Sequence, residues 1–374
     1  MTTSLKETAL HIKHSAQQAS SGLVGRETLI DLILLSAVAE EHLLIIGPPG
    51  TGKSAVVRAV SDMFDSSYFE YLLGRFTEPS ELFGPIDLQK LKEGIVETST
   101  KNMLPEADIV FLDEVFLGST AILNALLGVL NERTFRRGQT QLQCPLRICV
   151  AASNHLPQDD SLAAFADRFL VHYFVDNIPD SQLEHLLQSG WQYQHKKIME
   201  RIELNYLDQL THACRKADMS DIFRPLADCI RLLRKENILL SDRRIIKTQR
   251  LIAAAAILDG REKPSAQDLW PLLYVVGDEP TQQTARDLLK ETFAATQNET
   301  LSAAADHASN GPLARAQQLQ QQVRTLLAQP EENRNHLELE AIGREIDTQF
   351  SLETLPEGLR QAREALLIAL GTIA

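Results

Sequence analysis

The amino-acid sequence predicts an α/β fold with a parallel sheet over residues 1–180, followed by regions built of helices. Three short apolar runs, His42–Ile46, Ile109–Leu112 and Leu146–Ala152, are each followed by polar residues, and stretches with helical periodicity alternate with them. Apolar runs of this length are typical of strands that are buried on both faces of a parallel sheet. After Pro179 the pattern becomes almost entirely helical.

The chain of 374 residues is too long for one comfortable hydrophobic core, so we expect more than one domain. An α/β core covers residues 1–180, a helical domain covers 181–280, and a C-terminal helical bundle covers 281–374. The small and polar residues 297–312 predict a loop or linker in the third region. The expected apolar faces of its helices are Leu319, Val323 and Leu326, then Leu339, Ile342 and Ile346, then Leu359, Leu366 and Ile373.

Composition and charge narrow the class of protein. The formal net charge is −13, and a chain this acidic is not expected to coat nucleic acid nonspecifically, because phosphate binding needs clustered Lys and Arg. No run of about 18 apolar residues predicts a membrane span. The cysteines show no CxxC pair, so we expect buried, reduced thiols and a cytoplasmic location. They are Cys144, Cys149, Cys214 and Cys229.

Residues Gly47–Ser54 (GPPGTGKS) match the phosphate-loop pattern GxxxxGK[ST] in full. They follow an apolar strand and open a helix at Ala55–Met63, which is the context that the pattern requires. Backbone N–H groups of such a loop wrap phosphates, and the helix dipole adds to the attraction. We therefore predict an ATP and Mg²⁺ site, with Lys53 on the phosphates and the Ser54 hydroxyl on Mg²⁺. The predicted binding residues here are Gly47, Pro48, Pro49, Gly50, Thr51, Gly52, Lys53, Ser54 and Ala55.

Two acids, Asp113 and Glu114, follow the apolar run Ile109–Leu112. Acids are common at strand ends, but a phosphate loop earlier in the same domain gives this pair a more specific meaning. We predict that Asp113 holds Mg²⁺, directly or through water, and that Glu114 is the general base that polarises the attacking water. The alternative for Glu114 is an acid favoured by the dipole of a following helix.

Two further polar residues follow apolar segments. Asn154 comes after the run Leu146–Ala152 and could orient the attacking water, or could simply cap the next segment. Arg168 follows the apolar helical stretch Leu162–Ala166 and could act in a neighbouring subunit as an arginine finger. A surface ion pair with Asp167, worth little, is an equally weighted interpretation.

Two basic stretches allow two interpretations each. Arg243 lies where a helix opens in the second domain, and could contact the nucleotide or belong to a solvated turn. Residues Thr134–Gln143 predict a hairpin that turns at Gly138. Its Arg136 and Arg137 could form a basic tip that contacts a partner, or could be merely solvated.

The ordered set of these motifs resembles the AAA+ ATPases. Four stretches further resemble the MoxR family, and within it the RavA-like branch. The resemblance covers residues 20 to about 280 and weakens beyond. The stretches are Phe69–Pro85 (FEYLLGRFTEPSELFGP), Leu104–Glu114 (LPEADIVFLDE), Ile122–Phe135 (ILNALLGVLNERTF) and Ala151–Pro157 (AASNHLP).

The resemblance implies an αβα core followed by an all-α lid. It implies that Asn154 is sensor 1, that Arg168 is the arginine finger and that Arg243 is sensor 2. It places the residues Gly84–Leu104 in an insert near the pore of a ring, and the segment Thr134–Gln143 in the hairpin before the sensor strand. The segment Leu23–Arg26 resembles the one that lines the adenine pocket, and the residues implied to bind there are Leu23, Val24 and Gly25.

The resemblance also implies a hexameric ring that acts as a chaperone-like remodeller of a protein client. The implied partner is a protein with a von Willebrand factor A domain that bears a metal-ion adhesion site. This sequence departs from the family pattern at two places, which limits what the resemblance implies. Asp242 stands where the family often has Pro, so sensor 2 could instead be Arg244. The loop 297–312 stands where RavA-like proteins carry a β-rich insertion, so we do not expect a partner bound through that insertion.

Three functions remain open from the sequence. The first is an ATP-driven protein remodeller, favoured by the acidic charge and the resemblance. The second is a nucleic-acid motor, for which Arg136 and Arg137 are the only support. The third is a nucleotide-gated switch with little turnover, against which the acids Asp113 and Glu114 argue.

Overall fold

The computed structural model describes residues 5–193, 201–328, 336–349 and 355–370. A five-stranded parallel sheet lies at its centre, with the strand order β2-β3-β6-β1-β7. Its three inner strands coincide with the predicted apolar runs, which confirms the α/β fold class. The strands are β1 (Leu43–Ile46), β2 (Tyr68–Leu72), β3 (Ile109–Asp113), β6 (Ile148–Ser153) and β7 (Val171–Phe174).

The sequence analysis missed the two edge strands, β2 and β7. Residues of β2 are only partly buried, so no continuous apolar run marks this strand. In β7, a histidine interrupts the apolar pattern. His172 is buried and its Nδ1 lies 2.7 Å from the carbonyl oxygen of Gly277, so the polar residue serves the contact with the helical domain. Edge strands carry mixed patterns because one side lacks a neighbouring strand.

Successive residues of each inner strand face two different hydrophobic cores. Leu43 and Ile45 belong to the core on one face of the sheet, whereas Leu44 and Ile46 belong to the core on the other. This alternation explains the unbroken apolar runs, since both faces must be covered. The first face is covered by α1 (Leu5–Ser20), α2 (Glu27–Ala39) and α3 (Lys53–Asp62), and the second by α4 (Pro79–Phe83), α6 (Thr120–Glu132) and α7 (Asp160–Ala166).

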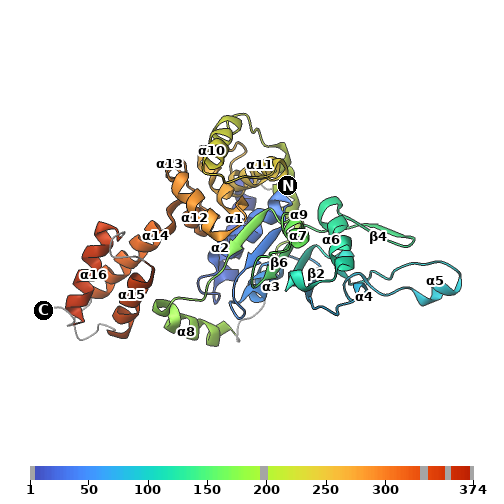
Figure 1. Ribbon diagram of the computed structural model, residues 1–374, viewed down its shortest axis with the longest axis horizontal. Coiled ribbons are helices and arrows are strands. Elements are labelled where there is room, and N and C mark those ends of the chain that lie inside the picture. Colours follow the sequence, from blue (N-terminus) through green and yellow to red (C-terminus); the bar gives the residue numbers. More distant parts are fainter. Residues whose placement is uncertain (1–4, 194–200, 329–335, 350–354, 371–374) are drawn as a thin grey trace.

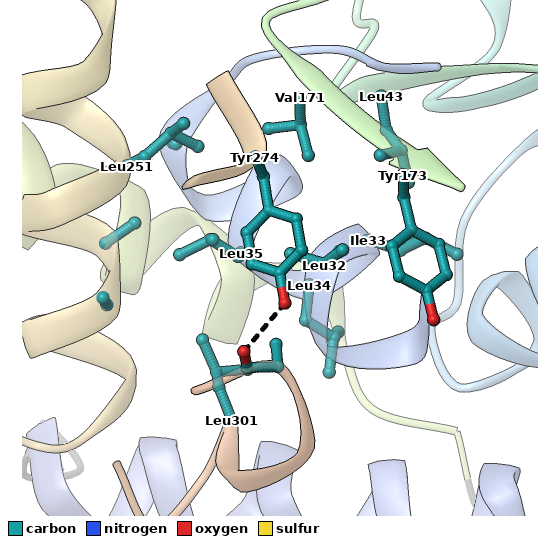
Figure 2. Packing of buried hydrophobic residues seen from close by; sticks show 14 of the residues in the cluster. Leu32, Ile33, Leu34, Leu35, Leu43, Val171, Tyr173, Leu251, Tyr274 and Leu301 are labelled. Atoms are coloured by element: carbon teal, nitrogen blue, oxygen red, sulfur yellow. Dashed lines mark hydrogen bonds between the residues drawn. The ribbon is translucent and has the colours of Figure 1, made fainter. Parts of the chain in front are cut away.

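The helical domain after the sheet shares the first of these cores. Figure 2 shows Tyr274 packed with Leu32 and Leu35 of α2, close to Val171 of β7 and Leu251 of α11. The buried core therefore crosses the boundary that we predict at residue 180. The elements of this region are α8 (Leu183–Tyr193), α9 (Leu204–Lys216), α10 (Phe223–Lys235), α11 (Asp242–Leu258), the 3₁₀ segments Ala266–Asp268 and Trp270–Val275, α12 (Glu279–Leu288) and α13 (Lys290–Phe293).

The predicted loop at 297–312 is wrong from residue 302 onward. The helix α14 runs without interruption over Ser302–Leu327. Its alanines are strong helix formers, and their small side chains let the helix pack closely on α2. The carboxylate of Asp31 in α2 accepts a hydrogen bond from the backbone N–H of Ala304 (3.0 Å), and so caps α14 from another element. The hydroxyl of Tyr274 donates to the carbonyl of Ala304 (2.8 Å).

The far end of α14 forms a separate three-helix bundle with α15 (His336–Gln349) and α16 (Glu357–Ala369). The three predicted apolar faces are confirmed, apart from Ile373, which lies outside the described residues. The buried residues are Leu319, Val323 and Leu326, Leu339, Ile342 and Ile346, and Leu359 and Leu366. Figure 1 shows this bundle at one end of the molecule.

A two-part arm projects at the opposite end (Figure 1). One part is the predicted hairpin of β4 (Thr134–Arg137) and β5 (Thr140–Gln143), which is confirmed. The other is the segment 84–103, with α5 (Leu88–Lys92) near its tip. The backbone N–H of Gln139 donates to the carbonyl of Val96 (2.9 Å), so the two parts are joined. Among the described residues, no helix combines the length and the apolar composition that a membrane crossing requires.

Candidate functional site

The phosphate loop joins β1 to α3 at the carboxyl edge of the sheet. Gly50 and Gly52 have φ values of +80° and +78°, a left-handed conformation that favours glycine. A Cβ built on either one meets no atom of the described residues within 4 Å, so open space surrounds the loop. At Gly47 a Cβ would lie 2.2 Å from the carbonyl oxygen of Val175, so only glycine fits there. The loop therefore opens toward solvent at the N-terminus of α3, where a phosphate chain binds best.

Lys53 is buried within the loop. Its Nζ donates to the carbonyl oxygens of Gly47 (2.8 Å) and Pro48 (2.9 Å). Burial lowers the pKa of Lys53, and the charges of Asp113 and Glu114 oppose that effect. Both hydrogen-bond partners are neutral, so phosphate oxygens can still neutralise the ammonium. The residues present therefore fit a nucleoside triphosphate.

Three predicted polar residues meet on adjacent strands. Glu114 follows β3 and Asn154 follows β6, its neighbour in the sheet. The Nδ2 of Asn154 donates to Oε1 of Glu114 at 2.7 Å. Asp113 ends β3 beside them, and its Oδ1 accepts a hydrogen bond from the backbone N–H of Glu114 (3.0 Å). Two acids and an amide thus stand at the carboxyl edge of the sheet, near Lys53.

The backbone at Glu114 is held in the left-handed region, with φ +50° and ψ 44°. For a residue other than glycine, this left-handed backbone conformation costs about 1–2 kcal/mol of free energy. The following 3₁₀ turn begins there, because the carbonyl of Glu114 accepts the backbone N–H of Leu117 (2.9 Å). Strained residues of this kind cluster at functional sites, where a side chain must point in an unusual direction.

Arg26 ties the phosphate loop to two other segments, a role that the sequence analysis missed. Its guanidinium donates to the carbonyl oxygens of Thr51 in the loop (2.8 Å), Gly25 (3.0 Å) and Asp176 after β7 (2.9 Å). Burial lowers the pKa of Arg26. The adjacent Leu23 and Val24 are buried as well, so the predicted adenine-binding segment lies fixed against the loop.

A cavity of about 490 Å³ lies beside the loop. Asn154 and Asp176 contribute from the sheet, and Glu279 at the start of α12 closes it from the helical domain. Burial raises the pKa of Glu279. Arg168 and Arg243 are not among the residues that line this cavity, and neither are Lys53, Asp113 and Glu114.

The two predicted arginines instead lie near each other. Burial, followed by the charge of Arg243, lowers the pKa of Arg168. The Nε of Arg168 is buried and has no hydrogen-bond partner among the described residues. The carboxylate of Asp167 is engaged elsewhere, by Arg244 (3.1 Å). The interpretation of Asp167 and Arg168 as a surface ion pair therefore does not describe this segment, where Asp167 pairs with Arg244.

Arg244 differs from its neighbour Arg243 in exposure. Arg244 is only 5% exposed and its guanidinium binds peptide carbonyls, whereas the side chain of Arg243 is exposed to solvent. This difference favours Arg243 over Arg244 as the arginine that could contact a nucleotide.

Comparison with known proteins identifies the family. The model of the MoxR domain found in MoxR-vWA-beta-propeller ternary systems matches residues 10–212, which is more than half of the chain. The chain belongs to the MoxR family of AAA+ ATPases. A second model, of an AAA lid domain, matches residues 218–287. The helical domain that follows the sheet in this MoxR protein is therefore the lid, as the resemblance implied, whereas the RavA-like branch stays a prediction.

Several individual proteins are similar to this MoxR protein. An uncharacterized protein of Methanocaldococcus jannaschii is 36% identical over 268 residues, covering 71% of each chain. Protein MoxR of Paracoccus denitrificans is 27% identical over 176 residues, covering 43% of this chain and 49% of that protein. A crystal structure of a candidate ATPase from Cytophaga hutchinsonii superimposes with a TM-score of 0.61 at 16% identity, covering 78% and 97% of the two chains. The last likeness concerns the fold alone.

Proposed function

We propose that this MoxR protein hydrolyses ATP at sites shared between copies of the chain. The observation that carries the proposal is the division of the site residues. The phosphate loop, Asp113, Glu114 and Asn154 meet at one edge of the sheet, whereas Arg168 and Arg243 lie near each other in a different segment. The Nε of Arg168 has no hydrogen-bond partner among the described residues and Arg243 lies near it, so this concentration of positive charge suits phosphate oxygens presented by a neighbouring copy.

The residues of one chain have distinct roles in binding. Backbone N–H groups of the loop and Lys53 hold the phosphates. Arg26 fixes the loop by its hydrogen bond to the carbonyl of Thr51. Ser54 and Asp113 supply oxygen ligands for a magnesium ion, which binds proteins through few side chains and otherwise through water and phosphate. When bound, magnesium neutralises charge on the phosphate oxygens.

Glu114 then acts on the attacking water. Its carboxylate accepts the water proton as general base, and the amide of Asn154, which donates to Oε1 at 2.7 Å, fixes the direction of that carboxylate. Arg168 of the neighbouring copy stabilises the charge that develops on the phosphate oxygens. Arg243, close to Arg168, adds a second positive charge.

We further propose that the ring, hexameric in our interpretation, remodels a protein client together with a von Willebrand factor A-domain partner. The name of the matching family model supports the partner and adds a β-propeller protein to the same system. The arm supports a protein client, because Leu88 near its tip is 70% exposed and Phe76 beside its base is 95% exposed. Arg137 of the hairpin donates to the carbonyl of Gly84 (3.3 Å), which leaves less basic surface for nucleic acid.

The substitution Glu114→Gln tests the enzymatic part of the proposal. Loss of the general base lowers Mg-dependent phosphate release by roughly 100- to 1,000-fold. Binding of a fluorescent ATP analogue stays within about threefold, since Glu114 is not among the phosphate-binding groups. Equal loss of binding and turnover, or unchanged turnover, would remove Glu114 from this role.

A further inference from the structure

The lid residue Arg244 contacts the segment that carries Arg168. Arg244 lies in the first turn of α11, where the hydroxyl of Ser241 caps the helix by accepting the backbone N–H of Arg244 (3.3 Å). The NH1 and NH2 groups of its guanidinium reach residues of the α/β core. Arg244 is 5% exposed, and burial lowers its pKa.

The groups that accept hydrogen bonds from Arg244 belong to residues on both sides of Arg168 in the sequence. NH1 donates to the carbonyl of Asp167 (3.4 Å), to Oδ1 of Asp167 (3.1 Å) and to the carbonyl of Phe169 (3.2 Å). NH2 donates to the carbonyl of Leu170 (2.8 Å). The carbonyl groups of the residues immediately before and after Arg168 are therefore both bound by one side chain of the lid.

Arg168 itself lacks comparable support. Its Nε has no hydrogen-bond partner among the described residues. The charge of Arg243 repels Arg168, while that of Asp167, which is bonded to Arg244, attracts it. Its direction consequently depends on the backbone from which it extends. The carbonyls that fix this backbone are held by a planar, buried fork of donors, which a flexible lysine ammonium cannot reproduce.

We propose that Arg244 is a positioning residue for the reaction: it holds the segment 167–170 so that Arg168 reaches the site of the neighbouring copy. This inference rests on the proposed function of Arg168. The remaining donor of Arg244, Nε, binds the carbonyl of Val275 in the lid (2.9 Å). A change in the position of α11 is therefore transmitted to Arg168, so that the lid of one subunit controls catalysis in the next.

A purely structural role would have a different signature. If Arg244 only fastened the lid to the core, its replacement would lower stability and disturb the ATP site of its own chain. If it positions Arg168, its replacement impairs the neighbouring site and spares its own. The two roles can be distinguished in mixed assemblies of two inactive variants, by measuring which pairs of variants recover ATPase activity.

The experiment uses Arg244→Lys in mixed assemblies of the full-length chain. Alone, Arg244→Lys lowers kcat by roughly 100-fold, the typical cost of a misplaced catalytic group, with ATP binding within about threefold of wild type. Co-purified with Glu114→Gln, it recovers activity, because an intact ATP site then meets an intact Arg168 at about one interface in four. Co-purified with Arg168→Ala, it stays inactive, since no interface has a well-placed arginine.

The opposite pattern overturns the inference. Recovery with Arg168→Ala but not with Glu114→Gln would show that Arg244 serves its own ATP site, and wild-type kcat in Arg244→Lys would show no positioning role. Arg168→Ala mixed with Glu114→Gln must itself recover activity. If it does not, the shared site of the proposed function fails, and the inference with it.

Two further variants guard against trivial explanations. Asp167→Asn removes one charged acceptor of Arg244 from a partly exposed position, and gives the same pattern of recovery even if Arg244→Lys does not fold. Arg261→Lys is the matched control, because Arg261 is a lid arginine bound to Asp268 and Asp259. It lowers the melting temperature without changing kcat. A loss of kcat in Arg261→Lys as large as in Arg244→Lys would contradict the specific role.

Discussion

The phosphate-loop edge of the sheet and the arginine segment at the lid differ in how far one chain completes them. At the loop, Lys53 lies near two acids, and Asn154 meets Glu114 at 2.7 Å. At the arginine segment, Arg168 and Arg243 lie close together without an ion-pair partner among the described residues. Like charges destabilise each other unless an anion lies between them. The first region combines a phosphate loop with two acids and an amide, whereas the second concentrates positive charge.

This difference suggests that the phosphate-loop edge contributes mainly to ATP binding, whereas the arginine segment contributes mainly to the rate of turnover. Groups at the loop contact phosphates before and during the reaction, so their loss weakens binding. An arginine supplied by a neighbouring copy acts mainly on the charge of the transition state, so its loss lowers turnover. Substitutions in the two regions should therefore separate KM from kcat.

Among these substitutions, replacement of Arg168 is expected to have the largest effect on activity. Arg168→Ala lowers kcat by about 1,000-fold or more, because the transition-state charge loses its stabilising guanidinium. ATP binding to the isolated chain changes little. Steady-state kinetics beside an equilibrium binding titration measure both quantities. A rise of KM with an unchanged kcat would place Arg168 with the binding groups and erase the contrast between the two regions.

Replacement of Arg26 tests the other region of this comparison, the phosphate-loop edge. In Arg26→Lys a single ammonium nitrogen replaces the three spaced guanidinium nitrogens that bind the three carbonyls, so the loop loosens at Thr51. We expect KM for ATP to rise by roughly tenfold, equivalent to about 1.4 kcal/mol, with kcat within about threefold. Arg58→Lys is the control, since Arg58 forms a partly exposed pair with Glu70 away from the loop. A kcat loss without a change in KM contradicts the assignment.

The smallest effect on activity, but a distinct one on stability, is expected at Asp31. Burial raises the pKa of Asp31 to about 7, and the charges of Glu27 and Asp306 add to this, while the N–H groups of Ala303 and Ala304 oppose it. The folded-state pKa lies above the ordinary value of 3.8, so the folded chain binds the extra proton. Stability therefore falls as the pH rises from about 4 to 7, and then stays level.

Asp31→Asn removes this dependence while keeping an acceptor for α14. We expect it to raise the free energy of unfolding by about 1–3 kcal/mol at pH 8, and to leave it nearly unchanged at pH 4. Chemical denaturation at the two pH values measures the difference, with the exposed Asp65→Asn as control. An equal change at both pH values would mean that ionisation of Asp31 is not the cause.

The predictability of each feature from sequence follows from how locally it is encoded. The phosphate loop, the inner strands and the hairpin have signatures within ten residues or fewer, and all were found. The edge strands β2 and β7 were missed, because their partly buried or polar residues break the apolar run. The sequence predicts a loop where α14 begins, because the acceptor that caps this helix, Asp31, lies far away in the sequence.

The roles of Arg26 and Arg244 could not be predicted for a related reason. Both guanidiniums bind mainly peptide carbonyls, which every residue possesses, so no spacing of residue types marks their partners. Arg26 is the last residue of the predicted adenine segment, and Arg244 follows Arg243 as the alternative sensor 2. Position within or beside a motif was the only signal available, and it did not distinguish a clamp from a solvated side chain.

The most direct test of the shared site is the specific ATPase activity of the wild-type chain over a wide range of protein concentration, with the assembly state followed by sedimentation velocity. We expect activity per chain to rise with concentration in step with assembly, because Arg168 must come from a second copy. Activity per chain that is constant from monomer to assembly would show that one chain is sufficient, and would contradict the account.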